Sequence, residues 1–209
     1  RRSKHFRSIF KDYKVTEVLS LTDKSLSKEQ SGAIGWCRLI DTALQKTPFK
    51  PFLLLEDDVS IKNSLPESIT IPEDSDWVYI GISSLGVRKR RIMDIICGES
   101  IDEDYLRVYN MLSTHGVIIN SPRGALGIHS ACLEGFFNNR VWDYYIAQIQ
   151  PWYNVYALKE PLVYQDTKFG GLSNTDITLG NCSELTKEYK NKGLVSFRIL
   201  SPNSNYLNV

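Results

Sequence analysis

The chain has 209 residues, of which 42% are hydrophobic and 23% are charged, and its formal net charge at pH 7 is +1. That length and apolar content suffice for a substantial core, and the small net charge argues against bulk electrostatic binding of nucleic acid. No apolar run approaches the length of a membrane span, and no secretory signal is present. We therefore expect one soluble domain over residues 1–200, with residues 201–209 as a tail or linker.

The chain begins with a predicted helix and a predicted strand. Apolar residues recur at helical spacing over residues 3–13, and the aliphatic run over residues 15–21 is typical of a strand. Thr22 and Asp23 close that strand. Polar residues in this place either form a plain turn or contact a ligand, and both interpretations stay open.

A second helix is predicted over residues 28–46. Ser27 is a suitable N-cap, because Gln30 three positions later can complete a capping box, and Pro48 and Pro51 end the helix. Four cysteines occur singly along the chain, and the spacing of zinc ligands is absent. We expect them to be reduced and mostly buried, in a reducing compartment such as the cytoplasm.

The most informative segment follows that helix. Residues 51–55 form an apolar run of strand length that leads directly into Glu56, Asp57 and Asp58, and then into Val59. Three carboxylates at one strand end repel one another and lose hydration, and a divalent cation would hold them together. In an extended strand Glu56 and Asp58 share a face while Asp57 points away. The segment predicts a site for Mn²⁺ or Mg²⁺ with Asp58 as a direct ligand, or else an acidic turn after a buried strand.

The middle of the chain alternates between connections and strands. Residues 61–75 are expected to form a surface connection, residues 76–81 a strand, and residues 83–91 a polar loop that ends in four basic residues. These cations either meet a diphosphate or an anionic acceptor, or form a solvated loop.

The second half predicts further strands and helices. Two short strands are expected within residues 105–120, and helices over residues 122–137, 138–149 and 183–192. Such alternation predicts an α/β fold with a mostly parallel central sheet flanked by helices. Ligands of such sheets bind at the carboxyl ends of the strands, where the acidic segment is expected to lie.

The order of these segments resembles glycosyltransferase family 25, whose members have the Rossmann-like GT-A fold. Glu56-x-Asp58 is similar to the DxD signature with which these enzymes hold Mn²⁺ or Mg²⁺ and the diphosphate of a nucleotide sugar. The other matching segments are 32–44, 76–81, 113–125, Trp142-Asp143, 155–165 and 170–173. In the family a strand precedes the Arg-rich first helix, so we expect this chain to be a monomeric domain of a longer protein.

The chain departs from the family pattern at two places that bear on which sugar donor it uses. The family usually has a Ser-His pair where this chain has Leu39-Ile40, and a Gly-Thr-x-x-Tyr strand where this chain has residues 113–117. The resemblance therefore leaves open whether the donor is galactose. The chain also resembles the amino-terminal glycosyltransferase domain of chlorella-virus proteins that build capsid glycans, which would imply an activated rhamnose donor and the host cytoplasm.

The resemblance suggests roles for particular residues. Asp143 matches the family's acid in its region and is the expected catalytic base, with Asp166 and Asp176 as reserves; a plain helix-start residue is the alternative for Asp143. Glu56 and Asp57 are expected to contact metal, sugar or ribose. Thr22, Asp23 and His115 are candidate donor contacts, although His115 is more typical of a structural histidine.

For two histidines and one loop the sequence supports weaker predictions. His5 and His129 are expected to be peripheral. The loop over residues 170–176 is either ordinary or able to close over the donor.

These observations predict a metal-dependent inverting transferase that moves a sugar from a nucleotide sugar, with UDP-sugar as the expected donor, to a glycan or glycoprotein acceptor. A nucleotidyltransferase or nucleotide-sugar hydrolase is a second enzymatic reading, although no Gly-rich phosphate loop is present. A non-catalytic carbohydrate-binding or scaffold domain with a degenerate transferase fold is the third hypothesis.

Overall fold

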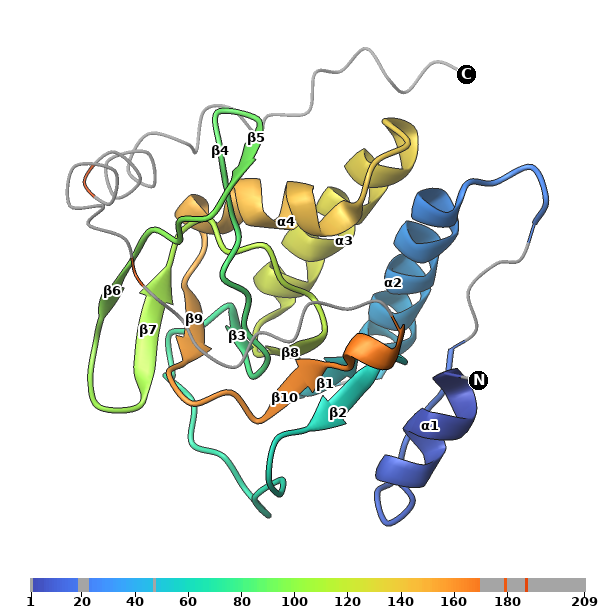
Figure 1. The fold of residues 1–209 in the computed structure, drawn as a ribbon, viewed down its shortest axis with the longest axis horizontal. Helices are drawn as coiled ribbons and strands as arrows, with labels where there is room; N and C mark the ends of the chain where they lie inside the picture. The colour runs from blue at the N-terminus through green and yellow to red at the C-terminus, as the bar shows by residue number, and fades with distance from the viewer. Residues whose placement is uncertain (1, 19–22, 47, 170–178, 180–186, 188–209) are drawn as a thin grey trace.

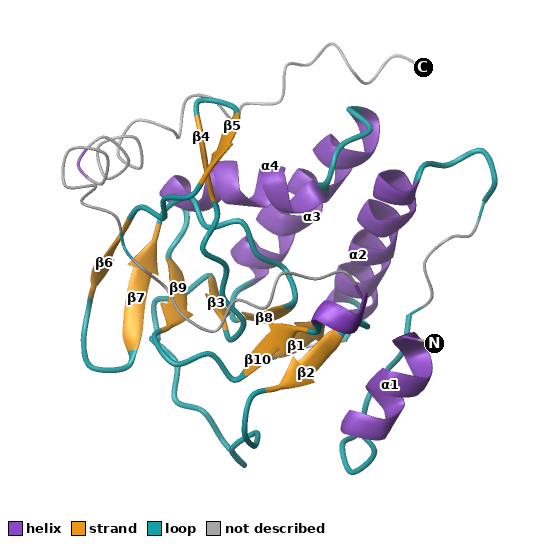
Figure 2. Ribbon diagram, viewed as in Figure 1, coloured by secondary structure: helices purple, strands orange, loops and turns teal. Residues whose placement is uncertain are grey.

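The computed structural model describes residues 2–18, 23–46, 48–169, 179 and 187. Its centre is a sheet of six strands in the order β1-β8-β3-β9-β7-β6, with two further two-stranded sheets, β10-β2 and β4-β5 (Figures 1 and 2). The strands are β1 (Phe52–Leu55), β2 (Val59–Ile61), β3 (Trp77–Tyr79), β4 (Gly86–Arg88), β5 (Arg91–Met93), β6 (Gly98–Ser100), β7 (Tyr105–Val108), β8 (Gly116–Ile119), β9 (Val155–Leu158) and β10 (Val163–Gln165).

The helices are α1 (Arg2–Ile9), α2 (Lys28–Leu44), α3 (Pro122–Phe137) and α4 (Trp142–Ile149), with short 3-10 turns at Gln150–Trp152 and Thr167–Phe169. Among the described residues, no helix has the length and apolar character needed to cross a membrane. The α/β class expected from the sequence is therefore present.

The sheet is mixed, and the expectation of a mostly parallel sheet was wrong. In the six-stranded sheet as described, β3 and β9 run parallel, while β1-β8, β8-β3, β9-β7 and β7-β6 run antiparallel. The physical reason lies in the connections, because a parallel pair needs a long crossover, usually helical. Between β3 and β8 the described chain forms short strands and loops and no helix, whereas α3 and α4 intervene before β9.

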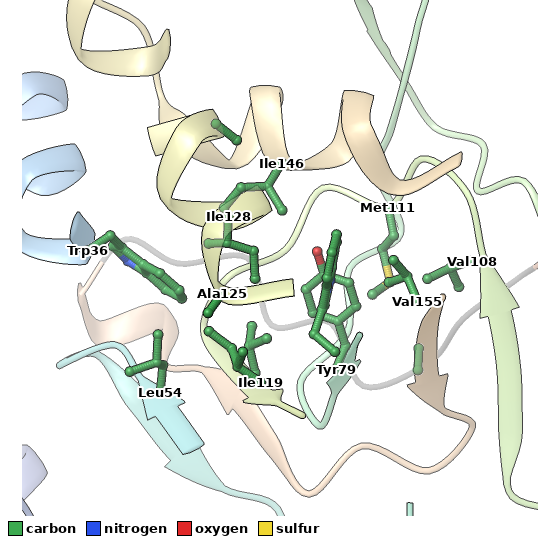
Figure 3. Packing of buried hydrophobic residues seen from close by; sticks show 14 of the residues in the cluster. Trp36, Leu54, Tyr79, Val108, Met111, Ile119, Ala125, Ile128, Ile146 and Val155 are labelled. Atoms are coloured by element: carbon green, nitrogen blue, oxygen red, sulfur yellow. The ribbon is translucent and has the colours of Figure 1, made fainter. Parts of the chain in front are cut away.

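The two faces of the sheet are covered differently. Alternate residues of β3 point to opposite faces, with Trp77 and Tyr79 in one hydrophobic cluster and Val78 in another. The first cluster packs against α2, α3 and α4, and it includes Trp36, Ile128 and Ile146 (Figure 3). The second cluster packs against α1 and the β10-β2 ribbon. The end of β1 therefore lies between two packed layers.

Several local predictions are confirmed. Ser27 accepts a hydrogen bond from the Gln30 backbone N–H, and the Gln30 side chain accepts one from the Ser27 N–H, so the capping box starts α2 as expected. α3 starts at Pro122, with Ser121 as its N-cap.

Other local predictions differ from the structure. α4 starts at Trp142 and not at residue 138, because Asn139 adopts a left-handed backbone conformation (φ 49°) that interrupts the helix. The basic segment expected as a loop is the β4-β5 hairpin, with Lys89 and Arg90 at its turn. Residues 15–18 form no strand. The described residues do not include residues 19–21 or the tail 201–209. Of the predicted helix over residues 183–192, they include Lys187 alone.

Candidate active site at the end of β1

Two neighbouring strands hold the acidic end of β1. The Glu56 N–H donates to the carbonyl oxygen of His115 at 3.3 Å, which continues the pairing of β1 with β8. The chain then turns at Asp57 and Asp58 and enters β2, where Val59 pairs with Gln165 of β10. The three acids thus lie in a turn and not in an extended strand, so their directions follow from the turn and not from strand alternation.

Glu56 is held by hydrogen bonds to both carboxylate oxygens. The Thr114 hydroxyl donates to Oε1 at 2.6 Å, and the Gln165 amide donates to Oε2 at 3.2 Å. Burial raises the pKa of Glu56 to about 7, and the charges of Asp58 and Asp143 add to the rise. Glu56 is therefore divided between its acid and carboxylate forms near neutral pH, and the electrostatic coupling places it close to both other acids.

Asp58 is buried beside the Arg2 guanidinium, and the charge of Lys28 also acts on it. Its side chain approaches Arg2, with Oδ2 at 3.4 Å from the guanidinium, while Oδ1 is buried and has no hydrogen-bond partner. Burial raises the pKa of Asp58 although Arg2 opposes the rise. Asp57, by contrast, exposes 59% of its side chain and lies 3.3 Å from Arg2. Asp58 and Asp57 thus differ as the sequence led us to expect, one turned inward and one outward.

Asp143 lies in the first turn of α4 and is fixed there by its neighbour Trp142. A Cβ atom at Gly32 of α2 would lie 2.1 Å from the Trp142 ring, and one at Gly135 of α3 would lie 2.9 Å from the Trp142 Cα, so both glycines make room for this residue. The Asp143 Oδ1 atom is buried without a hydrogen-bond partner. Burial raises the pKa of Asp143 to about 6, although the backbone N–H groups of Tyr144 and Asp143 itself oppose the rise.

His115 is buried next to this cluster. Its Nδ1 lies 3.3 Å from the Ser113 hydroxyl, its Nε2 has no hydrogen-bond partner, and burial lowers its pKa to about 4. A Cβ at Gly81 would lie 2.3 Å from the imidazole ring, so Gly81 provides the space for it. His115 is therefore neutral at physiological pH, and its backbone carbonyl positions Glu56.

Asp166 lies next to the acidic turn, because its N–H donates to the Asp58 carbonyl oxygen at 2.9 Å. Its carboxylate accepts from the Ser60 hydroxyl at 3.2 Å and from the Lys168 N–H at 2.9 Å, and the latter bond is the main cause that lowers its pKa. His5 Nε2 lies 3.1 Å from the same Ser60 hydroxyl and 3.9 Å from Asp166. These bonds hold the Asp166 carboxylate in place, and they bring His5 to the site although a peripheral position was expected.

The remaining candidates lie elsewhere. Asp23 is exposed and accepts from the N–H and hydroxyl of Ser25, each at 2.8 Å, which is the geometry of a plain turn. His129 lies on α3, 3.4 Å from Asp41 of α2. Thr22 and the whole loop over residues 170–176, with Asp176, are outside the described residues.

Three residues of the site were missed from the sequence. Arg2 bridges Asp57 and Asp58, and Thr114 and Gln165 hold Glu56. All three belong to segments that the sequence singled out, namely the Arg-rich first helix and the segments 113–125 and 155–165. Sequence spacing carried no signal for their convergence, because each contact joins segments far apart in the chain.

Neither a known relative nor a preformed metal centre in the described residues identifies this site. Comparisons with known protein families and with curated proteins found no match to this chain. Within the described ranges, no group of three or more His, Cys, Asp or Glu side chains is arranged to hold a metal ion. A cation at Asp58 would therefore need most of its ligands from substrate oxygens and water.

Proposed function

We propose that this chain is a metal-dependent inverting glycosyltransferase of GT-A type, similar to glycosyltransferase family 25, which uses a nucleotide sugar such as a UDP-sugar and a glycan acceptor. The observation that carries the proposal is that the buried acids Asp58 and Asp143 both act on Glu56. The two carboxylates come from different layers of the fold, and the charges of both raise the pKa of Glu56. Each has a buried Oδ1 without a hydrogen-bond partner, and burial raises the pKa of each. Unpartnered buried carboxylate oxygens are costly unless a ligand uses them.

Asp143 suits the role of general base. A base works best when its pKa lies near the operating pH, and burial raises the pKa of Asp143 to about 6. The acceptor hydroxyl oxygen would form a bond to the anomeric carbon while the bond from that carbon to the diphosphate breaks. The hydroxyl proton passes to Asp143, and attack from the face opposite the leaving group inverts the anomeric configuration.

Asp58 suits the role of a metal ligand. Mg²⁺ and Mn²⁺ in such sites are bound by one or two carboxylates, with phosphate oxygens and water as the other ligands, so a larger protein cage is not required. Asp58 offers one buried oxygen without a partner, next to the exposed carboxylate of Asp57. The cation, when bound, would neutralise charge on the leaving diphosphate. Arg2 lies on the same two carboxylates and adds positive charge for that group.

The fold is consistent with this proposal at the level of architecture. The acids lie at the carboxyl end of β1, which is where α/β sheets bind ligands, and α2 leads directly into that strand. α4 brings Asp143 to the same end. The GT-A assignment itself rests on the resemblance of the segments in the sequence.

A non-catalytic carbohydrate-binding or scaffold domain is the second candidate function. The observation that favours it is Arg2, because its guanidinium already balances Asp57 and Asp58 without a metal. A degenerate transferase that replaced its cation by an arginine would have this appearance.

A thermal-shift panel separates the two candidates. We expect one nucleotide sugar to raise the melting temperature in the presence of Mn²⁺ and to lose that effect in EDTA, since a ligand that binds the folded state stabilises it. The stabilising donor is then incubated with glycan acceptors, and the anomeric configuration of the product is determined by NMR. Stabilisation by free glycans without any nucleotide sugar would support the scaffold, and retention of configuration would exclude the inverting scheme.

A further inference from the structure

Residues of the β4-β5 hairpin, of the turn that precedes α4 and of α2 line an open depression. Its volume is about 370 Å³, which is within the range of small-ligand pockets, roughly 300–1,000 Å³. The residues that form its wall are Arg90, Ile92, Asn139, Arg140, Val141 and Tyr144. Glu29 of α2 contributes an acidic side chain to the edge.

Two cations of this depression have no acidic partner. In the part of the chain that the structure describes, neither Arg90 nor Arg140 forms an ion pair, and Arg140 lies 5.9 Å from the centre of the Tyr144 ring. Burial raises the pKa of Tyr145, and the Arg140 and Arg90 guanidiniums both oppose that rise. The two positive charges therefore act on the same place, although the whole chain carries a net charge of only +1.

Tyr144 lines the depression with its ring, and its hydroxyl is turned into the protein. Tyr144 is only 6% exposed, and its hydroxyl is buried without a hydrogen-bond partner in the described structure. Native proteins seldom leave such a group unpaired. Arg90 (φ 64°) owes its left-handed backbone to the two-residue turn of the β4-β5 hairpin, and Asn139 (φ 49°) owes its own to the break before α4.

We propose that this depression binds an anionic sugar unit of the acceptor, one that carries a carboxylate or a phosphate group. Guanidinium groups recognise both anions through paired hydrogen bonds, and the Ile92 and Val141 side chains can cover the apolar part of a sugar ring. The inference rests on the proposed function in one respect: the ligand is a unit of the acceptor that this function requires.

The test measures binding without any donor. Isothermal titration of the intact chain compares tetragalacturonate with its neutral methyl ester, and mannose 6-phosphate with mannose. We expect the anionic member of at least one pair to bind ten-fold or more tightly, and the pair that does so identifies carboxylate or phosphate as the preferred group. Arg90→Gln and Arg140→Gln should each weaken this binding at least five-fold, and Arg140→Lys should restore only part of it, because lysine keeps the charge but lacks the planar fork.

Two further variants provide controls. Arg91→Gln removes the same charge from the next residue, which does not line the depression, and it should change the affinity by less than two-fold. Tyr144→Phe should change ligand affinity by less than two-fold, because the hydroxyl that it removes is buried and has no surface open to the depression.

The outcomes separate this inference from the proposed function. Equal binding of charged and neutral sugars, or equal losses in Arg91→Gln and Arg90→Gln, would overturn the anionic site. Arginine-dependent binding in a chain that transfers no sugar from any nucleotide sugar would retain the site and reject the transferase.

Discussion

At the scale of single residues, Asp58 and Asp143 share one chemical situation and differ in their counter-charge. Both are largely buried, both keep Oδ1 without a hydrogen bond, and burial raises the pKa of both. Arg2 lies beside Asp58, whereas Asp143 forms no ion pair with any described residue. A carboxylate beside a cation stays charged and can hold a metal, and one without a cation is better placed to accept a proton. The environments therefore assign different roles to two chemically identical groups.

The role of Asp143 predicts a specific kinetic effect. Asp143→Asn keeps the size of the side chain but removes its ability to take a proton, so turnover should fall by about 10² or more, a usual share of general-base catalysis. The affinity for the nucleotide sugar should change less than two-fold, and the melting temperature should not fall, because the asparagine oxygen can accept the same backbone hydrogen bonds and a buried charge is lost. Steady-state kinetics with a true acceptor checks this. Near-normal turnover would transfer the role to Asp166 or Asp176.

The role of Asp58 predicts an effect on metal-linked binding. Asp58→Ala should abolish the Mn²⁺ dependence of UDP binding while the chain stays folded, because the substitution removes a buried charge that Asp57 and Glu56 repel. Titration calorimetry with and without Mn²⁺ measures the effect. Asp57→Ala is the matched control, since Asp57 contacts the same Arg2 from an exposed position. Unchanged metal dependence in Asp58→Ala would remove this residue from the metal site.

At the scale of elements, α2 and α3 position α4. The Trp142 side chain and backbone occupy space left by Gly32 and Gly135, so the first turn of α4, with Asp143, depends on two glycines in other helices. Gly32→Ala would push a methyl group into the Trp142 ring. We expect a loss of about 1–3 kcal/mol in the free energy of unfolding, as for other overpacked sites, together with a lower turnover. Urea denaturation and kinetics measure both, and Ser31→Ala on the same helix should change neither.

Secondary structure with local signals could be predicted from the sequence, and contacts between distant elements could not. Ser27 and Gln30 predict the start of α2, and the apolar run before Glu56 predicts β1. The direction of β8 between β1 and β3 depends on what connects β3 to β8, and local propensity does not encode it. The contact of Arg2 with Asp58 is likewise tertiary. The acids could therefore be found from the sequence. The groups that contact them and shift their pKa values, namely Arg2, Thr114 and Gln165, could not.

At the scale of the whole molecule, the buried site makes stability depend on pH. The pKa of Glu56 is raised from 4.5 to about 7 and that of Asp143 from 3.8 to about 6, so the folded state holds protons that the unfolded state releases. Such groups contribute stability that is present below the unfolded pKa and is lost as the pH rises through the folded pKa. His115 acts in the opposite sense, because its pKa is lowered from 6.5 to about 4, and its contribution is lost as the pH falls below 6.5. Between pH 6 and 8.5 the acids therefore dominate.

We expect the melting temperature to fall between pH 6 and 8.5, and Glu56→Gln to flatten this dependence. Glutamine can keep both hydrogen bonds, since its carbonyl oxygen accepts from Thr114 and its amide can donate to Gln165 once that amide is flipped. Because it carries no charge at any pH, the variant should match the native chain at pH 4, below the unfolded pKa of Glu56, and melt a few degrees higher at pH 8. Calorimetric scans at fixed ionic strength measure the two slopes, with the exposed Glu103→Gln as the control for net charge. Parallel slopes for the native chain and Glu56→Gln would show that Glu56 is ionised throughout this range, and the electrostatic account of the acidic site would then fail at its central residue.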